Sequence, residues 1–282
     1  MNPIDQLFGR LRAQGRKAFL AFLTAGDPDL ATTLAAGREL VRAGADLIEI
    51  GFPYSDPIAD GPVIQASYTR ALERGLRLDE VFACVRQLAD TPEVAGSPSR
   101  ERDPATGAPK TPLVAMVSYS LIHRRGPEAF LRQAQEAGLS GAIVPDLPVE
   151  ESERLGELAA ARDFKLIHLV TPTTPRDRAL RIARCSTGFL YCVSVTGITG
   201  ERDALPESLR EQLTWLREQT DLPLCVGFGI SRPEHVRMLR DCADGVIVGS
   251  AIVRRLEQAA TRPLPEVLDE VRALVRSLRG SL

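Results

Sequence analysis

The chain has 282 residues, a formal net charge of −2, 44% hydrophobic residues and 26% charged residues. This composition is typical of a globular protein long enough for two small domains or one α/β barrel, and its charge lacks the basic excess of a nucleic-acid-binding protein. No apolar run is as long as a transmembrane helix, and residues 1–16 lack the apolar stretch of a signal peptide, so we expect a cytoplasmic protein.

Short apolar runs recur along the chain, separated by amphipathic stretches. The runs that we predict to be strands are residues 18–23, 46–50, 113–117, 141–144, 165–170, 188–193, 222–226 and 245–248. The predicted helices between them include residues 30–43, 78–89, 128–137, 152–161, 205–219 and 233–241. Apolar residues in these stretches recur near i, i+3, i+4 and i+7, which indicates helices with one buried face.

Alternating strands and helices indicate a parallel sheet, and eight repeats favour a closed (β/α)₈ barrel over an open sheet. No G-x-G-x-x-G motif opens the first helix, which argues against a dinucleotide-binding sheet. We therefore predict the α/β class, with one TIM-barrel domain over residues 1–282 and extra helices at residues 3–13 and 264–279. Residues 91–111, rich in Pro, Gly and Ser, are predicted to be a surface insertion on the face opposite catalysis.

A carboxylate interrupts the second predicted strand. Glu49 lies in an otherwise apolar run, and burying an unpaired ionised carboxylate is costly, so this residue needs a specific reason. The turn after the strand brings a second carboxylate, Asp60, beside Gly61. Two carboxylates in different environments suit a site with one proton transfer and one charge to stabilise. The alternative is that Glu49 pairs with a cation in the core.

Two glycine-rich segments follow the last two predicted strands, at residues 227–231 and 249–253. In barrels of this class the loops after the seventh and eighth strands commonly hold a phosphate, because glycine lets the backbone approach an anion. We therefore predict a phosphate site formed by these two segments together. The loop after the sixth strand contains Gly197 and Gly200 and is predicted to fold over a ligand.

Several other residues near strand ends are candidates for lesser roles. Three aromatic residues could wall a flat substrate or pack in the core: Phe22, Tyr191 and Phe228. Asp27 and Asp146 are expected to cap loops or hold a neighbouring group. His168 is expected to be a hydrogen-bonded core residue. The five cysteines form no C-x-x-C pair and the three histidines have no metal-ligand spacing, so we expect free thiols and no metal site.

Residues 48–61, Ile-Glu-Ile-Gly-Phe-Pro-Tyr-Ser-Asp-Pro-Ile-Ala-Asp-Gly, resemble the signature of the tryptophan synthase α subunit family. Residues 19–28, 145–152, 194–200, 227–231 and 249–253 resemble segments of the same family in the same order. The resemblance covers nearly the whole chain apart from the insertion. It implies reversible retro-aldol cleavage of indole-3-glycerol phosphate to indole and glyceraldehyde 3-phosphate, without a metal or organic cofactor.

The resemblance also implies a role for individual residues. Glu49 would move protons between the substrate hydroxyl and indole carbon 3, and Asp60 would hold the indole N–H and stabilise positive charge on the ring. The implied substrate-binding residues are Phe22, Tyr191, Thr199, Gly200, Phe228, Gly229, Gly249 and Ser250, with Thr199 and Gly200 on the mobile loop. The implied partner is a β subunit, in an α₂β₂ heterotetramer, that receives the indole.

The family's contact with the β subunit is formed by the loop at residues 53–61 and the loop after the third strand. Ser120 stands in that second loop where family members usually have Asn, so partner recognition is less firmly implied than catalysis. Three alternatives stay open: a stand-alone lyase that releases free indole, another phosphate-binding barrel isomerase, and a subunit whose main role is to activate a partner.

Overall fold

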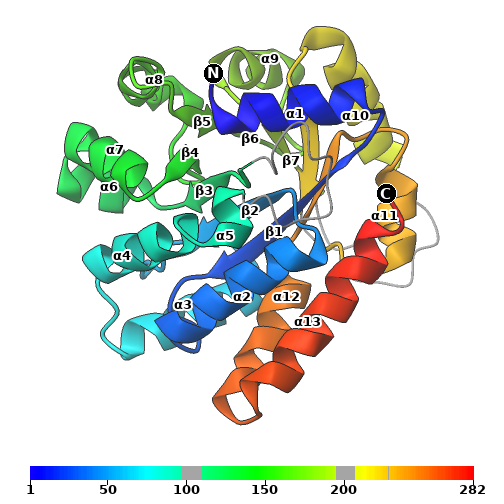
Figure 1. Ribbon diagram of the computed structural model, residues 1–282. Helices are drawn as coiled ribbons and strands as arrows, with labels where there is room; N and C mark the ends of the chain where they lie inside the picture. The colour runs from blue at the N-terminus through cyan, green and yellow to red at the C-terminus, as the bar shows by residue number, and fades with distance from the viewer. Residues whose placement is uncertain (97–109, 195–206, 228) are drawn as a thin grey trace.

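The computed structural model describes residues 1–96, 110–194, 207–227 and 229–282, which form a parallel sheet surrounded by helices (Figure 1). Within these residues the strands are β1 (Ala18–Thr24), β2 (Leu47–Gly51), β3 (Leu113–Met116), β4 (Leu139–Ile143), β5 (Lys165–Ile167), β6 (Leu169–Val170), β7 (Leu190–Val193), β8 (Leu224–Gly227) and β9 (Gly245–Val248). They pair in the order β5-β4-β3-β2-β1-β9-β8-β7-β6.

The two ends of this order are consecutive pieces of one stretch of chain. β5 pairs with β4, β6 pairs with β7, and only His168 separates β5 from β6. The sheet therefore comes round on itself with eight strand positions, one of them divided in two. This confirms the predicted (β/α)₈ barrel, and the divided position is the predicted strand at residues 165–170.

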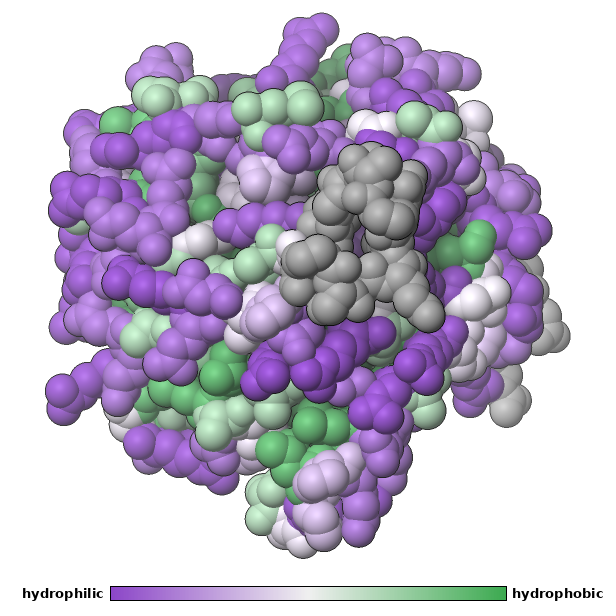
Figure 2. Space-filling view, viewed as in Figure 1, coloured by the Kyte–Doolittle hydropathy of each residue, from purple (hydrophilic) through white to green (hydrophobic). Residues whose placement is uncertain are grey.

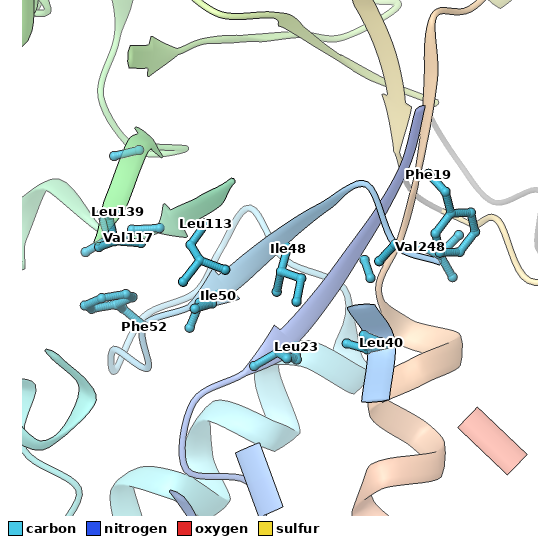
Figure 3. Close-up of a cluster of buried hydrophobic side chains, with 14 of the residues drawn as sticks. Phe19, Leu23, Leu40, Ile48, Ile50, Phe52, Leu113, Val117, Leu139 and Val248 are labelled. Atoms are coloured by element: carbon cyan, nitrogen blue, oxygen red, sulfur yellow. The ribbon is translucent and has the colours of Figure 1, made fainter. Parts of the chain in front are cut away.

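The core has two layers because side chains alternate between the two faces of each strand. On β1, Phe19, Ala21 and Leu23 face the surrounding helices, while Leu20 and Phe22 face the barrel interior. Figure 3 shows part of the outer layer, where Leu23 and residues of β2 lie near Leu40. All seven residues of β1 are buried, as expected for a strand covered on both faces.

The helices are α1 (Pro3–Ala13), α2 (Leu30–Ala43), α3 (Pro62–Glu73), α4 (Leu78–Ala89), α5 (Pro92–Ala95), α6 (Tyr119–Arg125), α7 (Pro127–Glu136), α8 (Glu153–Ala160), α9 (Arg176–Cys185), α10 (Glu207–Gln219), α11 (Pro233–Leu239), α12 (Ser250–Leu256) and α13 (Leu264–Arg279), with 3₁₀ turns at η1 (Val149–Glu151) and η2 (Glu257–Ala260). Helices α1, α2, α4 and α13 have the predicted bounds. Helices α3, α5, α6, α9 and α12 were not among the predicted ones.

Helix α1 covers the N-terminal end of the barrel and lies across the sheet in Figure 1. Its apolar face, which includes Ile4, Leu7 and Leu11, is buried in the same cluster as the side chains of the barrel interior. Asn2 caps the helix by accepting a hydrogen bond from the backbone N–H of Ile4 at 2.9 Å. The Asn2 amide also donates to the carbonyl of Ser140, at 2.9 Å, which ties the helix to β4.

Helices α2 and α13 lie side by side, so the last helix of the chain packs against the helix that follows β1 (Figure 1). The buried carboxylate of Glu39 on α2 accepts a hydrogen bond from the guanidinium of Arg272 on α13. Asp46, at the start of β2, accepts a hydrogen bond from the backbone N–H of Phe19 at 3.0 Å and pairs with Arg279 at 3.4 Å. The acidic groups of this outer layer are therefore neutralised by arginines of the last helix.

The start of the predicted insertion is packed against the barrel, so the prediction of an exposed loop is wrong there. Residues Pro92–Ala95 form α5, and Val94 is fully buried in the outer core. Glu93 pairs with Arg42 and Arg38 of α2. The reason is that a single apolar residue, with two ion pairs beside it, suffices to hold one helical turn against α2. Residues 97–109 lie outside the described residues.

The face of the molecule drawn in Figure 2 is mainly hydrophilic. Among the described residues, the large apolar side chains recorded as exposed are those of Met1 and Ile58, and Ile58 lies in the loop after β2. No helix in the described part of the chain is both long and apolar enough to cross a membrane.

Candidate active site

Glu49 points into the barrel from β2. Residues 47 and 49 share one face of the strand, and Leu47 belongs to the interior cluster. The Glu49 side chain is fully buried, and neither carboxylate oxygen has a hydrogen-bond partner among the described residues. Burial, with a smaller contribution from the charge of Asp60, raises the pKa of Glu49 to about 8. The alternative of a core cation as partner finds no support in the described residues.

Asp60 lies in the loop between β2 and α3 and is also buried. The hydroxyl of Tyr54 donates a hydrogen bond to Asp60 Oδ2 at 3.3 Å, and the amide of Gln65 donates to the Asp60 carbonyl at 2.7 Å. Burial raises the pKa of Asp60, and the hydrogen bond from Tyr54 lowers it, with a net value of about 6. The Gln65 contact fixes the loop on the first turns of α3.

The two carboxyl groups therefore differ in protonation near pH 7. With pKa values of about 8 and about 6, Glu49 is mainly protonated and Asp60 is mainly ionised. A pair whose environments push the pKa values apart can supply one proton donor and one fixed negative charge. The sequence predicted two different roles for these residues, and the structure supplies a physical cause for the difference.

Phe22 lies on β1, the neighbour of β2, and Tyr191 lies on β7, three strands further round the barrel. In the order β2-β1-β9-β8-β7, Phe22 of β1 stands directly beside Glu49 in the strand register. A Cβ on Gly51 would lie 2.5 Å from the Phe22 ring, and a Cβ on Gly227 would lie 2.3 Å from the Tyr191 hydroxyl. Both positions therefore need glycine. Burial, followed by the charges of Glu49 and Asp60, raises the pKa of Tyr191, so this phenol stays neutral.

The predicted phosphate residues that the structure describes lie at the ends of adjacent strands. Gly229 follows β8 with a φ of +77°, a left-handed conformation that favours glycine. Gly249 follows β9, and its carbonyl accepts hydrogen bonds from the first turn of α12, which begins at Ser250. The β8–β9 pairing brings these segments to the same edge of the barrel. Thr199, Gly200 and Phe228 lie outside the described residues.

Asp27 and Asp146 hold neighbouring groups, as the sequence predicted. Asp27 accepts two hydrogen bonds from Arg70, at 2.9 and 2.7 Å. Asp146 accepts hydrogen bonds from the hydroxyl of Ser118 at 2.6 Å and the backbone N–H of Tyr119 at 2.8 Å, and so fixes the loop after β3. His168 is a buried core residue, as expected, and its backbone N–H donates to Ser186 Oγ at 3.0 Å, whereas its side-chain Nε2 has no hydrogen-bond partner among the described residues.

Sequence reasoning missed the two tyrosines beside the carboxylates. Tyr54 was noticed only as part of the signature, and Tyr68 was not noticed at all. Tyr68 lies on α3 with Ile64 and Ala71 on the buried face. That helical spacing could have placed Tyr68 toward the barrel. A cavity of about 400 Å³ is lined by Ala59, the residue before Asp60, and by Pro145, Leu169 and Val193, but by neither carboxylate.

Comparison with known proteins identifies the family. A family model described as tryptophan synthase alpha chain matches residues 8–280. The chain belongs to the tryptophan synthase alpha chain family. It is 52% identical to the tryptophan synthase alpha chain of Rhodopirellula baltica, over 100% of this chain and 99% of that one, and 45% identical to that of Acaryochloris marina, over 100% and 98%.

Solved structures agree with this assignment. Tryptophan synthase subunit alpha from Legionella pneumophila is similar with a TM-score of 0.84 and 34% identity, covering 100% of this chain and 98% of that one. A chain of the tryptophan synthase a2b2 complex from Pyrococcus furiosus is similar with a TM-score of 0.81 and 35% identity, covering 93% and 98%. Membership of this family decides against an unrelated phosphate-binding isomerase.

Proposed function

We propose that this chain catalyses the retro-aldol cleavage of indole-3-glycerol phosphate to indole and glyceraldehyde 3-phosphate. The observation that carries the proposal is the pair of buried carboxyl groups, Glu49 without a partner among the described residues and Asp60 bonded to Tyr54. Burial raises the pKa of Glu49 further than that of Asp60. Breaking a carbon–carbon bond at indole needs a proton delivered to the ring carbon and a proton removed from a hydroxyl. A carboxyl group that starts protonated can do both in turn.

In the first step the Glu49 carboxyl gives its proton to indole carbon 3, and the ring nitrogen takes up the positive charge. The Asp60 carboxylate accepts a hydrogen bond from the ring N–H and stabilises that charge inside a site from which water is largely excluded. In the second step the Glu49 carboxylate removes the proton of the hydroxyl on the adjacent side-chain carbon. A carbonyl forms there, the bond to carbon 3 breaks, and its electron pair returns to the ring.

The remaining residues would bind and enclose the substrate. Phe22 and Tyr191 border the interior beside Glu49 and suit a flat aromatic ring. Gly229, Gly249 and Ser250 are proposed to hold the phosphate, because they follow adjacent strands at one edge of the barrel. Thr199, Gly200 and Phe228 are proposed as further substrate contacts, and the loop with Thr199 and Gly200 as a cover over the bound substrate.

We also propose that the chain assembles with a β subunit into an α₂β₂ complex and passes indole to it. The proposal is supported by family membership and by Ile58, whose side chain is 85% exposed on the loop that also carries Asp60. A single exposed apolar side chain is ordinary on a protein surface, but this one lies in the loop through which the family contacts its β subunit. Asp146 fixes the second proposed contact loop through Ser118 and Tyr119, so both loops connect directly to the candidate site.

The experiment is to mix the purified chain with indole-3-glycerol phosphate and to measure indole, with and without a cognate β subunit. We expect cleavage, and stimulation by at least about tenfold with the β subunit, which is within the usual range of coupling between sites. Replacing Pro53 or residues 118–120 should weaken the stimulation. High activity that the β subunit leaves unchanged would favour a stand-alone lyase, and no indole in either mixture would refute the reaction.

A further inference from the structure

Tyr68 carries a hydroxyl that the reaction scheme above does not use. The side chain is fully buried, and its oxygen has no hydrogen-bond partner among the described residues. Leaving a buried hydroxyl without a partner destabilises a protein, and phenylalanine would fill the same space without that penalty. The hydroxyl therefore needs an explanation other than packing.

The position of this hydroxyl is known from its neighbours. A Cβ on Gly51 would lie 2.6 Å from the Tyr68 oxygen, so the hydroxyl reaches the barrel interior at the level of Gly51. Residues 49 and 51 point to the same face of β2, so Tyr68 ends one side-chain layer above Glu49. Its ring packs on that of Tyr54, with the centroids 5.4 Å apart, and the Tyr54 hydroxyl already donates to Asp60.

We propose that Tyr68 is a positioning residue whose hydroxyl donates a second hydrogen bond to the Asp60 carboxylate once substrate is bound. This inference rests on the proposed function. Among the described residues one side chain, that of Tyr54, donates to the Asp60 carboxylate, at the long distance of 3.3 Å. Hydrogen bonds in active sites are often long before substrate binds and shorten in the complex.

The charges around Tyr68 agree with this assignment. Burial raises the pKa of the Tyr68 phenol, and of the charged groups near it Asp60 contributes most to that shift, ahead of Tyr54 and Glu49. The phenol therefore stays protonated and can donate a hydrogen bond to the ionised carboxylate of Asp60. Of the two carboxylates, Asp60 is the one that must remain negative while the indole ring is positive, so it is the group that gains from a second donor.

The test is Tyr68→Phe, with Tyr54→Phe as the companion variant. Removing a donor raises the pKa of Asp60, so activity that requires ionised Asp60 should begin at a higher pH. For each variant we expect kcat near pH 7 to fall about tenfold. The acid limb of the kcat profile, which reports the enzyme–substrate complex, should move up by about one pH unit. The melting temperature of Tyr68→Phe should be unchanged or higher, because the variant removes an unpaired buried hydroxyl.

Two outcomes would overturn the inference. Full activity with an unmoved acid limb in Tyr68→Phe would show that the hydroxyl has no role. Lower activity with an unmoved acid limb would show that it acts on a group other than Asp60. Wild-type chain and Glu49→Gln are measured in parallel: a wild type without cleavage activity refutes the proposed function itself, whereas an active wild type with an equally active Tyr68→Phe refutes only the role of Tyr68.

Discussion

Two buried glutamates ten residues apart have opposite surroundings. Glu39, on the outer face of α2, is bonded to Arg272 and lies near Arg42. Glu49, inside the barrel on β2, has no partner for either oxygen among the described residues. The same contrast holds along one short segment, because Asp46, the residue before β2, has both a backbone donor and Arg279.

This difference in surroundings distinguishes the carboxylates that stabilise the barrel from the carboxyl group that we propose takes part in the reaction. A buried carboxylate bonded to arginine holds two elements together, whereas Glu49, without a partner among the described residues, has a raised pKa and is available to substrate. The outer layer near α13 and the N-terminal strand ends are of the first kind. The interior near the C-terminal ends of β1 and β2 is of the second kind, and the following experiments test that division.

The largest effect is expected for Glu49→Gln. Glutamine keeps the size of the side chain but cannot transfer a proton, and this group would serve two transfers, so we expect kcat to fall by about 10⁴-fold or more. The pKa of Glu49 is raised from 4.5 to about 8, so the folded state holds a proton that the unfolded chain releases. Wild-type stability should therefore decrease between pH 5 and pH 8, and Glu49→Gln should lack this decrease.

Steady-state cleavage and thermal unfolding on the same sample separate the two interpretations of Glu49. A stable variant that binds substrate analogue and does not turn over supports catalysis. A variant that is unstable but active would place Glu49 in the first class, together with Glu39.

Asp60→Asn should lower kcat by about 10²–10³-fold, because it removes the negative charge that faces the ring nitrogen in the transition state. Asp60→Glu should retain more activity than Asp60→Asn, because the charge survives at a shifted position. The measurement is indole release at saturating substrate. Equal activity of the two variants would show that hydrogen bonding, and not charge, is what Asp60 provides.

The pH profile of kcat/KM should be bell-shaped. Asp60 must be ionised and Glu49 protonated, so kcat/KM should be highest between about pH 6 and pH 8. It should fall about tenfold for each pH unit below or above that range. A profile that is flat from pH 5 to pH 9 would contradict the assigned protonation states.

Glu39→Gln is the matched control, from the outer layer where acidic residues pair with arginines of α13. It is the same substitution at another buried glutamate, and it should lower the free energy of unfolding by about 1–2 kcal/mol, since Arg272 is partly exposed and the pair is partly screened. The cleavage activity of the folded protein should be unchanged. A loss of kcat comparable to that of Glu49→Gln would mean that the two regions are not separate.

The smallest effect is expected for deletion of residues 97–107. The segment connects α5 to the start of β3, the end of that strand opposite the candidate site, and loop length changes the closure entropy only slowly. The catalytic constants should stay within about threefold of the wild type. α5 is left intact in this variant because Val94 is part of the core. A hundredfold loss would show that the segment contributes to the site.

The barrel could be predicted because its signals are local. Helix α2 has the predicted bounds since Asp29 caps its start and Gly44 takes a left-handed conformation at its end. The break at His168 and the packing of Val94 could not be predicted, because both depend on contacts between distant segments. Residues 97–109 and the proposed cover over the site remain predictions.

The candidate site could likewise be predicted only in part. Glu49 was found because a charge in an apolar run is conspicuous in the sequence itself. Tyr68 was missed because a tyrosine on the buried face of a helix is expected from packing alone. The different pKa values of Glu49 and Asp60 arise from burial and from a single hydrogen bond with Tyr54, which are properties of the fold.

Helix α1 closes the N-terminal end of the barrel. Because Leu7, Leu11 and the rest of its apolar face occupy the N-terminal end, molecules that reach Glu49 must enter and leave by the opposite rim. The loop with Ile58 stands on that same rim, since it follows the C-terminal end of β2. In the proposed reaction, a β subunit bound at this rim would cover the route by which indole leaves the site.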